Sequence, residues 1–108
     1  MSFALHPKLE NDTFLLGAKG NCHILLMNDQ RFPWLIVVPA YENITELHQL
    51  EVSAQATLLT TVSSLSDEFQ KLTGAHKMNL AALGNQVPQL HIHIIARYRD
   101  DVAWPNPV

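Results

Sequence analysis

The most informative segment of the chain is Gln89-Leu90-His91-Ile92-His93-Ile94-Ile95-Ala96. Alternate side chains of a β-strand point to opposite faces, so the residues at 90, 92, 94 and 96 would form one aliphatic face. The other face would carry Gln89, His91 and His93, with the histidine Cα atoms roughly 6.6 Å apart at about 3.3 Å per residue. We therefore expect a strand over 89–96 that packs on a helix and presents two neighbouring imidazoles on its opposite face.

Four further segments have the length and composition of strands. Each is a short run of apolar, β-branched or aromatic residues bounded by turn residues. The runs are Thr13–Leu16, Cys22–Met27, Trp34–Val38 and Met78–Leu83. Short links join the first three runs, which favours antiparallel neighbours over crossover connections.

One long helix is predicted between the third and fourth runs. Its apolar residues follow the four–three spacing of a helix face: Leu58, Val62, Leu65, Phe69 and Leu72. The helix extends from about Val52 to Leu72, and we expect Gly74 in the left-handed conformation that ends it. Ile44–Leu50 is expected to form a short helical turn before it. The order βββαββ predicts an α+β fold: a mainly antiparallel five-stranded sheet with one main helix on one face and the other face open to a ligand or a second subunit.

Composition and charge argue against several classes of function. The chain has 108 residues, 47% of them hydrophobic, which suits one domain over residues 1–108. Cys22 is the only cysteine, so disulfides and a cysteine zinc cluster are excluded, and we expect Cys22 in the core. The net charge is −3 and no basic stripe exists, which argues against a nucleic-acid polymer as partner. The sequence has no apolar run of the roughly 20 residues that span a membrane, and residues 1–11 lack signal-peptide features, so we expect a cytoplasmic protein with no membrane partner.

The two histidines allow three interpretations. They could lie on a solvated polar face, because half-buried strands commonly have one polar face. They could bind zinc, but zinc needs three or four protein ligands and the remaining candidates form no local spacing with this pair. They could serve nucleophilic catalysis, because an imidazole attacks phosphorus or acyl carbon when one nitrogen is free and the other is held as a donor.

A longer segment around the histidines carries a family resemblance. Residues 84–95 are Gly84-Asn85-Gln86-Val87-Pro88-Gln89-Leu90-His91-Ile92-His93-Ile94-Ile95. This segment resembles the signature of the histidine triad (HIT) family, in which three histidines alternate with apolar residues. The second and third histidines correspond to His91 and His93, and the first corresponds to Gln89. The similarity continues upstream through residues 25–29 and 33–39 and downstream to 104–105, and it is strongest to short bacterial HIT proteins with Val-Pro-Gln-Leu-His-x-His.

The resemblance implies a HIT-like fold and an activity. HIT proteins are nucleotide hydrolases and transferases that act on the α-phosphate of nucleoside phosphoramidates and dinucleoside polyphosphates, without metal or cofactor. The middle histidine of the family attacks phosphorus and forms a nucleotidyl-histidine, and by position this role falls on His91. His93 would bind phosphate oxygens, as the third histidine does in the family.

Two residues depart from the family pattern. Gln89 cannot carry a proton at neutral pH, so protonation of the leaving group is expected to be weaker. Losing a general acid costs about 10²–10⁴ in rate for poor leaving groups. The family often has a histidine near the start of the third strand, where this chain has Trp34; an indole cannot titrate, but it could stack on a base or fill space.

Four other polar residues match substrate-contacting positions of the family. Asn28 would bind ribose hydroxyls, although an asparagine also favours the turn that follows. Asn79, Asn85 and Gln86 would contact phosphate, although turn chemistry alone could explain Asn85. We expect Arg97 and Arg99 to be solvated charges at a strand end, followed by a tail over 100–108.

The leading hypothesis is a nucleotide hydrolase or nucleotidyl transferase that works through His91. The alternative is a nucleotide-binding module with little turnover, because Gln89 and Trp34 both remove proton donors. A small metal-binding domain at His91 and His93 is a third, weaker hypothesis. The resemblance also implies a homodimer whose sheets join edge to edge, with Trp104 as a candidate contact.

Overall fold

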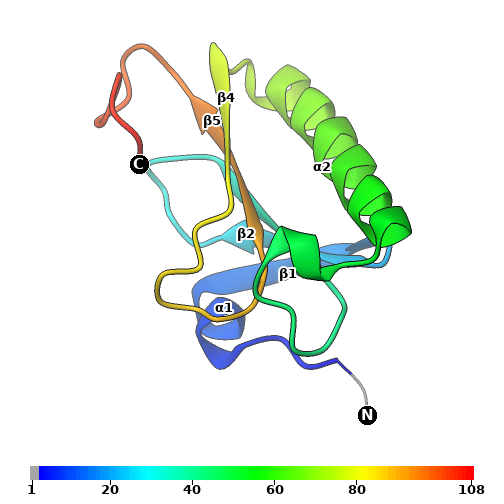
Figure 1. Cartoon of the computed structure of the whole chain (residues 1–108). Coiled ribbons are helices and arrows are strands. Elements are labelled where there is room, and N and C mark those ends of the chain that lie inside the picture. The colour runs from blue at the N-terminus through cyan, green and yellow to red at the C-terminus, as the bar shows by residue number, and fades with distance from the viewer. Residues whose placement is uncertain (1–2) are drawn as a thin grey trace.

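The computed structural model describes residues 3–108, which form a five-stranded sheet and two helices (Figure 1). The strand order is β1-β2-β3-β5-β4, and every pair of neighbours is antiparallel. The elements are α1 (Pro7–Asp12), β1 (Thr13–Lys19), β2 (Cys22–Met27), β3 (Trp34–Pro39), the 3-10 turn η1 (Leu47–Gln49), α2 (Val52–Thr73), β4 (Lys77–Ala81) and β5 (Ile92–Arg97). The predicted α+β fold, with five antiparallel strands and one main helix, is confirmed.

The β1–β2 hairpin is longer than the sequence predicted. We expected the first strand to end at Leu16, but β1 passes through a bulge between Leu15 and Gly17 and continues to Lys19. Glycine is common at bulges because it tolerates the irregular backbone. Gly20 and Asn21, both with φ of 58°, then form a two-residue turn, since Lys19 pairs directly with Cys22.

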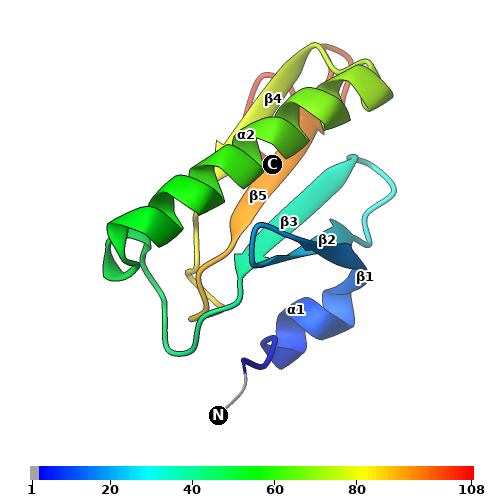
Figure 2. The same cartoon turned by 90° about the vertical axis from the view of Figure 1, so that its right-hand side faces the viewer.

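Helix α2 covers one face of the sheet (Figure 2). Leu58 and Val62 are buried against residues of β2, β3 and β5, as the apolar stripe predicted. Gly74 follows the helix with φ of 66°, so the predicted left-handed end is confirmed. Leu72 was expected in the stripe but is 82% exposed, because it lies at the margin of the stripe in the last helical turn.

The opposite face of the sheet is less open than we expected, because α1 and the residues before it cover part of it. Figure 2 shows α1 beside β1, away from α2. Leu9 of α1 joins Leu25, Ile36, Val38 and Val87 in a second buried cluster, and Phe3 and Leu5 pack against it. Strands β2 and β3 therefore carry apolar residues on both faces. Helix α2 covers one face, and α1 with the residues before it covers the other.

The last two strands differ from the prediction at the histidine end. β4 ends at Ala81 instead of Leu83, and β5 begins at Ile92 instead of Gln89. The backbone N–H of Leu90 donates to the carbonyl of Ile44, so the chain before β5 pairs with the loop after β3. His91 therefore immediately precedes β5, while His93 lies within it.

Arg97 is buried, which corrects our expectation of a solvated charge. Its guanidinium is 1% exposed, donates to the carboxylate of Asp101 at 2.8 Å and 3.1 Å, and donates to the Asn106 carbonyl at 2.7 Å. The guanidinium also lies over the rings of Phe32 and Trp104. The residues after β5 fold back on the end of the sheet and supply these acceptors, so they do not form a free tail.

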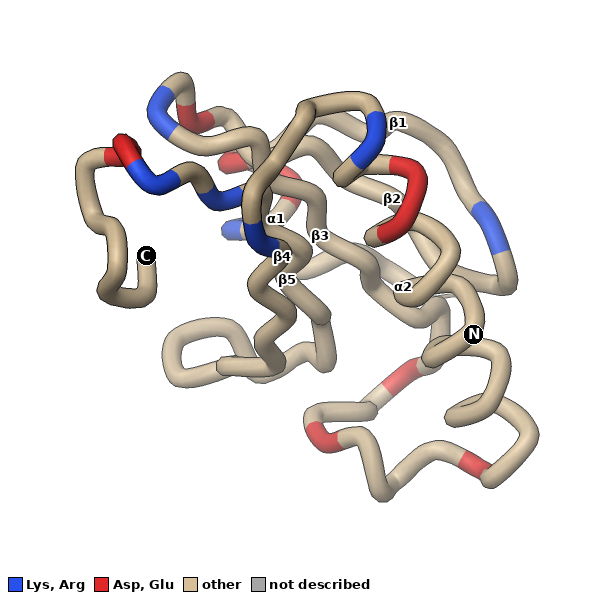
Figure 3. The backbone as a smooth tube through the Cα atoms, turned by 90° about the horizontal axis from the view of Figure 1, so that it is seen from above, with Lys and Arg blue, Asp and Glu red and all other residues tan. Residues whose placement is uncertain are grey.

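Charged residues are distributed over several elements. Figure 3 shows blue and red segments next to each other at the end of β5, whereas the loop between β3 and α2 carries only red ones. Among residues 3–108, no helix has the length and apolar character needed to cross a membrane.

Candidate active site

His91 and His93 stand side by side and are both buried. Their ring centroids are 4.9 Å apart, with the ring planes at 70°. The side chains are only 5% and 7% exposed, respectively. The interpretation of a solvated polar face is therefore wrong, although the predicted adjacency of the two rings is correct.

The backbone fixes the protonation of the His91 ring. Nδ1 of His91 lies 2.6 Å from the carbonyl oxygen of Gln89. A carbonyl oxygen only accepts hydrogen bonds, so Nδ1 carries the proton and donates it. In the neutral ring, Nε2 then keeps its lone pair, and this is the state in which an imidazole acts as a nucleophile.

His93 is held in the opposite neutral tautomer, with its proton on Nε2. Nδ1 of His93 accepts a hydrogen bond of 2.9 Å from the indole Nε1–H of Trp34. Burial, together with the neighbouring His91, lowers the pKa of His93 from 6.5 to about 4. At neutral pH His93 is therefore uncharged and carries its proton on Nε2, where it can serve as a hydrogen-bond donor.

Both histidines line a cavity of about 260 Å³. Its apolar wall comes from α1, the strand ends and the loop after β4: Leu9, Met27, Ile36, Leu83 and Val87. Its polar groups are Lys8, Asp12, Asn85, Gln86 and the two histidines, with Gly84 beside them. A mostly apolar hollow with a few converging polar groups is the usual form of a small-molecule site, and the volume of this cavity is slightly below the usual range for ligand pockets, which begins at about 300 Å³.

Two of the predicted substrate-binding residues line this cavity and a third lies beside it. Asn85 and Gln86 are lining residues in the loop before the histidines. Gly84, with φ of 70°, makes the turn that brings this loop to the site. Asn28 is exposed and follows Met27, and its backbone N–H donates to the carbonyl of Asp12, so it lies next to two lining residues.

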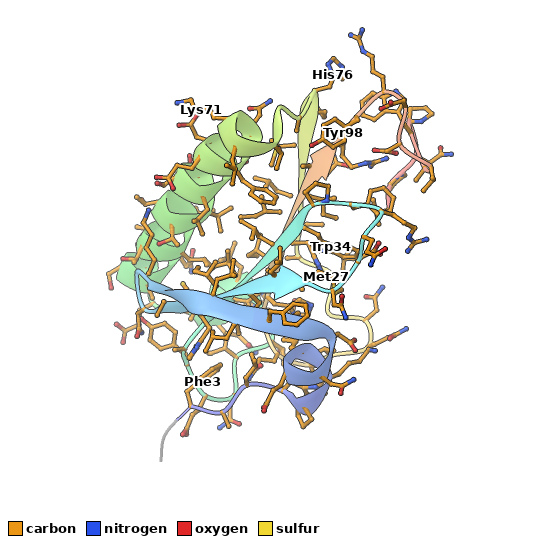
Figure 4. All side chains as sticks on the ribbon, turned by 180° about the vertical axis from the view of Figure 1, so that it is seen from behind. Phe3, Met27, Trp34, Lys71, His76 and Tyr98 are labelled. Carbon is orange, nitrogen blue, oxygen red and sulfur yellow. The ribbon has the colours of Figure 1, made fainter. Side chains whose placement is uncertain are left out.

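The other three predicted substrate-binding residues have partners within the protein. The side chain of Gln89 accepts from the backbone N–H of His6 at 2.8 Å and donates to the carbonyl of Ala4 at 2.9 Å. The amide oxygen of Asn79 accepts from Arg97 at 2.8 Å. Trp34 donates to His93, and Figure 4 shows it near Met27. None of the three belongs to the cavity lining found among residues 3–108.

Sequence reasoning missed the contribution of α1. Lys8 and Asp12 line the cavity and form an ion pair of 3.0 Å. A signal for this helix was present, because Pro7 occupies its first position and Glu10 lies in its first turn. At six residues, the helix was too short for an apolar periodicity to reveal it.

The described residues contain no group of three or more His, Cys, Asp or Glu side chains arranged to hold a metal ion. Cys22 lies in the core below α2, as predicted, and burial raises the pKa of its thiol.

The comparisons with known proteins agree with this geometry. The model of the HIT domain family matches residues 8–100, which is most of the chain. The chain belongs to the HIT domain family. HIT proteins are nucleotide hydrolases and transferases, and the histidine pair beside the cavity is what this chain retains of the HIT signature.

Solved structures of bacterial HIT proteins are similar over almost the full chain. A histidine triad protein from Marinobacter aquaeolei VT8 is 49% identical, with a TM-score of 0.98, covering 100% of this chain and 79% of that one. One from Sinorhizobium meliloti 1021 is 45% identical, with a TM-score of 0.97 and coverages of 98% and 78%. One from Bradyrhizobium japonicum is 42% identical, with a TM-score of 0.98 and coverages of 100% and 81%. Among curated proteins, no significant match was found.

Proposed function

We propose that this HIT protein is a nucleotide hydrolase or nucleotidyl transferase acting on the α-phosphate of nucleoside phosphoramidates or dinucleoside polyphosphates. The observation that carries the proposal is the hydrogen bond from His91 Nδ1–H to the Gln89 carbonyl, which leaves Nε2 with a free lone pair in a ring that lines the cavity. This bond uses the backbone of Gln89, so it is independent of the side chain at the first triad position.

The reaction would proceed in two displacements. Nε2 of His91 attacks the α-phosphorus, forming an N–P bond while the bond to the leaving group breaks and its electron pair departs with that group. A nucleoside polyphosphate leaves as the anion, and an amine leaving group takes up a proton from solvent. Water, or another acceptor, then attacks phosphorus and breaks the N–P bond. This releases the nucleotide, passes the proton of the attacking water to solvent and restores neutral His91.

The neighbouring groups would stabilise the charge that develops on phosphate. Nε2–H of His93 is a donor at neutral pH, and the amide groups of Asn85 and Gln86 line the same cavity. Removing one such donor typically costs about 10²–10³ in rate. The apolar wall of Leu9, Met27 and Val87 offers the nucleobase a surface on which to pack.

A specific observation also favours the second candidate, a nucleotide-binding module with little turnover. The amide of Gln89 cannot transfer a proton, and both its polar atoms are engaged by the N-terminal backbone, so this residue neither protonates nor hydrogen-bonds the leaving group. His93, with a pKa of about 4, is not a proton donor of the imidazolium type at neutral pH.

Turnover and the covalent intermediate separate these two functions. The protein is incubated with adenosine 5′-phosphoramidate or diadenosine tetraphosphate, quenched in alkali and analysed by mass spectrometry for nucleotide release and an adenylylated peptide containing residue 91. We expect His91→Ala to lose adduct and turnover by several orders of magnitude, and His93→Ala to lose about 10²–10³. His76→Asn, a change at an exposed histidine outside the cavity lining, serves as the control. Binding of adenosine monophosphate without adduct or release in the wild type would support the module.

We also propose a homodimer that joins at the β4 edge of the sheet. β4 is an edge strand and therefore carries unpaired backbone groups on its outer side. Leu80 of β4 and Leu59 of α2 are more than half exposed and border a groove of about 610 Å³. Trp104, which the sequence also suggested for a dimer contact, is half-buried against Arg97 and His76 of its own chain, and its contact with a partner stays a prediction.

A further inference from the structure

We propose that Trp34 is a positioning residue that holds His93 as a neutral ring protonated on Nε2, so that His93 presents a fixed N–H donor to the cavity. The tautomer follows from the contacts of this chain alone. Its meaning for catalysis rests on the proposed function.

The hydrogen bond between the Trp34 indole and the His93 imidazole is compatible with only one tautomer of His93. The indole nitrogen of tryptophan is a donor only, and it lies 2.9 Å from Nδ1 of His93. Nδ1 must therefore offer a lone pair, which places the single proton of the neutral imidazole on Nε2. A charged imidazolium would carry protons on both nitrogens and could not accept this bond, so the contact also disfavours protonation of His93.

The fold holds this pair in place. Trp34 is the first residue of β3 and His93 lies on β5, and these two strands are paired, with Trp34 opposite Ile95 and Ile36 opposite His93. The ring centroids of Trp34 and His93 are 5.5 Å apart at an angle of 57°. Trp34 is half-buried against the cluster on the α1 side of the sheet, so the indole has little freedom to turn away.

The two hydrogen bonds give the neighbouring histidines opposite tautomers. His91 is protonated on Nδ1 by its bond to a carbonyl, while His93 is protonated on Nε2 by its bond to an indole. One ring therefore offers a lone pair at Nε2 and the other offers an N–H at Nε2. A proton also cannot pass through His93 by way of Nδ1, because that nitrogen faces an indole that does not titrate. In this proposal Trp34 orients His93 through a hydrogen bond and does not stack on the nucleobase.

The test is nitrogen NMR of protein labelled with ¹⁵N in histidine and tryptophan, at one pH near 7.5. In the wild type we expect His93 to show a protonated Nε2 and an unprotonated Nδ1, His91 the reverse, and a scalar coupling across the hydrogen bond between Trp34 Nε1 and His93 Nδ1. A wild-type spectrum with His93 protonated on Nδ1, or without this coupling, would overturn the proposal, whether or not any variant folds.

Substitution then tests whether Trp34 is the cause. In Trp34→Phe we expect the coupling to disappear and the Nδ1 resonance of His93 to shift as the ring exchanges between tautomers, while His91 keeps its wild-type pattern. Trp104→Phe is the matched control, because that indole lies over Arg97 and beside His76. An unchanged His93 spectrum in Trp34→Phe, or the same shift in Trp104→Phe, would contradict the assignment.

Addition of adenosine monophosphate separates this proposal from the proposed function. We expect the nucleotide to shift the Nε2–H signal of His93 and to leave the coupling to Trp34 intact. Loss of the coupling on addition would mean that Trp34 turns to stack on the base, which would overturn the positioning role. No response to the nucleotide, with the coupling present, would count against the nucleotide function and leave the role of Trp34 standing.

Discussion

At the scale of single residues, the site depends on which atom each imidazole nitrogen faces. His91 and His93 are two residues apart and in contact, yet one faces a carbonyl oxygen and the other an indole N–H. These partners provide a lone pair on His91 and an N–H donor on His93, and no charged residue among residues 3–108 hydrogen-bonds to either ring. Two identical side chains thus acquire different chemistry from their immediate neighbours.

The low pKa of His93 predicts a pH dependence of stability. The folded pKa of about 4 lies below the ordinary value of 6.5, so the unfolded chain binds a proton more readily. His93 therefore contributes its full stabilisation above pH 6.5, and this contribution is lost as the pH falls from 6.5 towards 4. In urea unfolding across this range, we expect His93→Gln to show a flatter decline of the midpoint than the wild type.

An exposed histidine provides the control for this measurement. His48→Gln alters a solvent-exposed side chain and should reproduce the wild-type pH dependence. Parallel curves for the wild type and His93→Gln would show that His93 is not held neutral by the fold.

At the scale of elements, two glycines with positive φ have different surroundings. Gly74 ends α2 with φ of 66°, and a Cβ added there would meet no atom of the described residues within 4 Å apart from those of its chain neighbours. Gly20, in the β1–β2 turn with φ of 58°, lies against α2, and an added Cβ would overlap the Thr61 hydroxyl. Thr61 is buried and has little room to move. The first glycine is needed only for its backbone conformation, whereas the second is also needed for the close approach of hairpin and helix.

Alanine substitutions should separate these two requirements. We expect Gly74→Ala to lower the free energy of unfolding by about 1 kcal/mol, the cost of a left-handed residue. Gly20→Ala should cost about 1–3 kcal/mol more, because the added methyl group overpacks the hairpin–helix contact. Urea unfolding measures both values, and the additional loss should disappear when Gly20→Ala is made in a Thr61→Ala background. Equal losses for the two single variants would contradict this account.

At the scale of the whole molecule, Arg97 joins the sheet to the C-terminal residues. Its guanidinium contacts Asp101, Asn79 of β4 and the Asn106 carbonyl. Asp101 also accepts from three backbone N–H groups, including that of Trp104. Breaking a buried pair of this kind leaves a charge without its partner and is strongly destabilising.

This ion pair predicts a loss of stability in acid. The Arg97 guanidinium holds the pKa of Asp101 well below its ordinary value of 3.8, against the opposing effect of burial. Asp101 therefore stabilises the fold above about pH 4, and this stabilisation is lost as the pH falls further. We expect Asp101→Asn to be less stable than the wild type at pH 7 and to show a shallower decline below pH 4 in urea unfolding. Asp67→Asn, at an exposed pair with Lys71, should keep the wild-type decline.

The proposed dimer gives a prediction at the same scale. Leu80→Lys places a charge in the exposed groove at the β4 edge, so we expect it to convert the dimer to monomer in sedimentation velocity. Leu16→Lys makes the same change on β1, at the other edge of the sheet, and should leave the dimer intact. A monomeric wild type at micromolar concentration, or dissociation caused by Leu16→Lys, would contradict an interface at β4.

The sequence by itself determined the order of the five strands and the main helix, the family and the adjacency of the histidines. The spacing of Leu58 and Val62 predicts α2, Gly74 predicts its end, and strand alternation places His91 beside His93. These features depend on contacts within a few residues, which helix and strand geometry fix in advance.

Only the tertiary structure decided what each side chain of the site faces. Trp34 and His93 are 59 residues apart in the chain, and the Gln89 side chain bonds residues more than 80 positions away. Arg97 is buried because the chain after β5 folds back on it. Alternation along a strand gives the face on which a side chain lies, but its hydrogen-bond partner depends on which distant segment fills the space above that face.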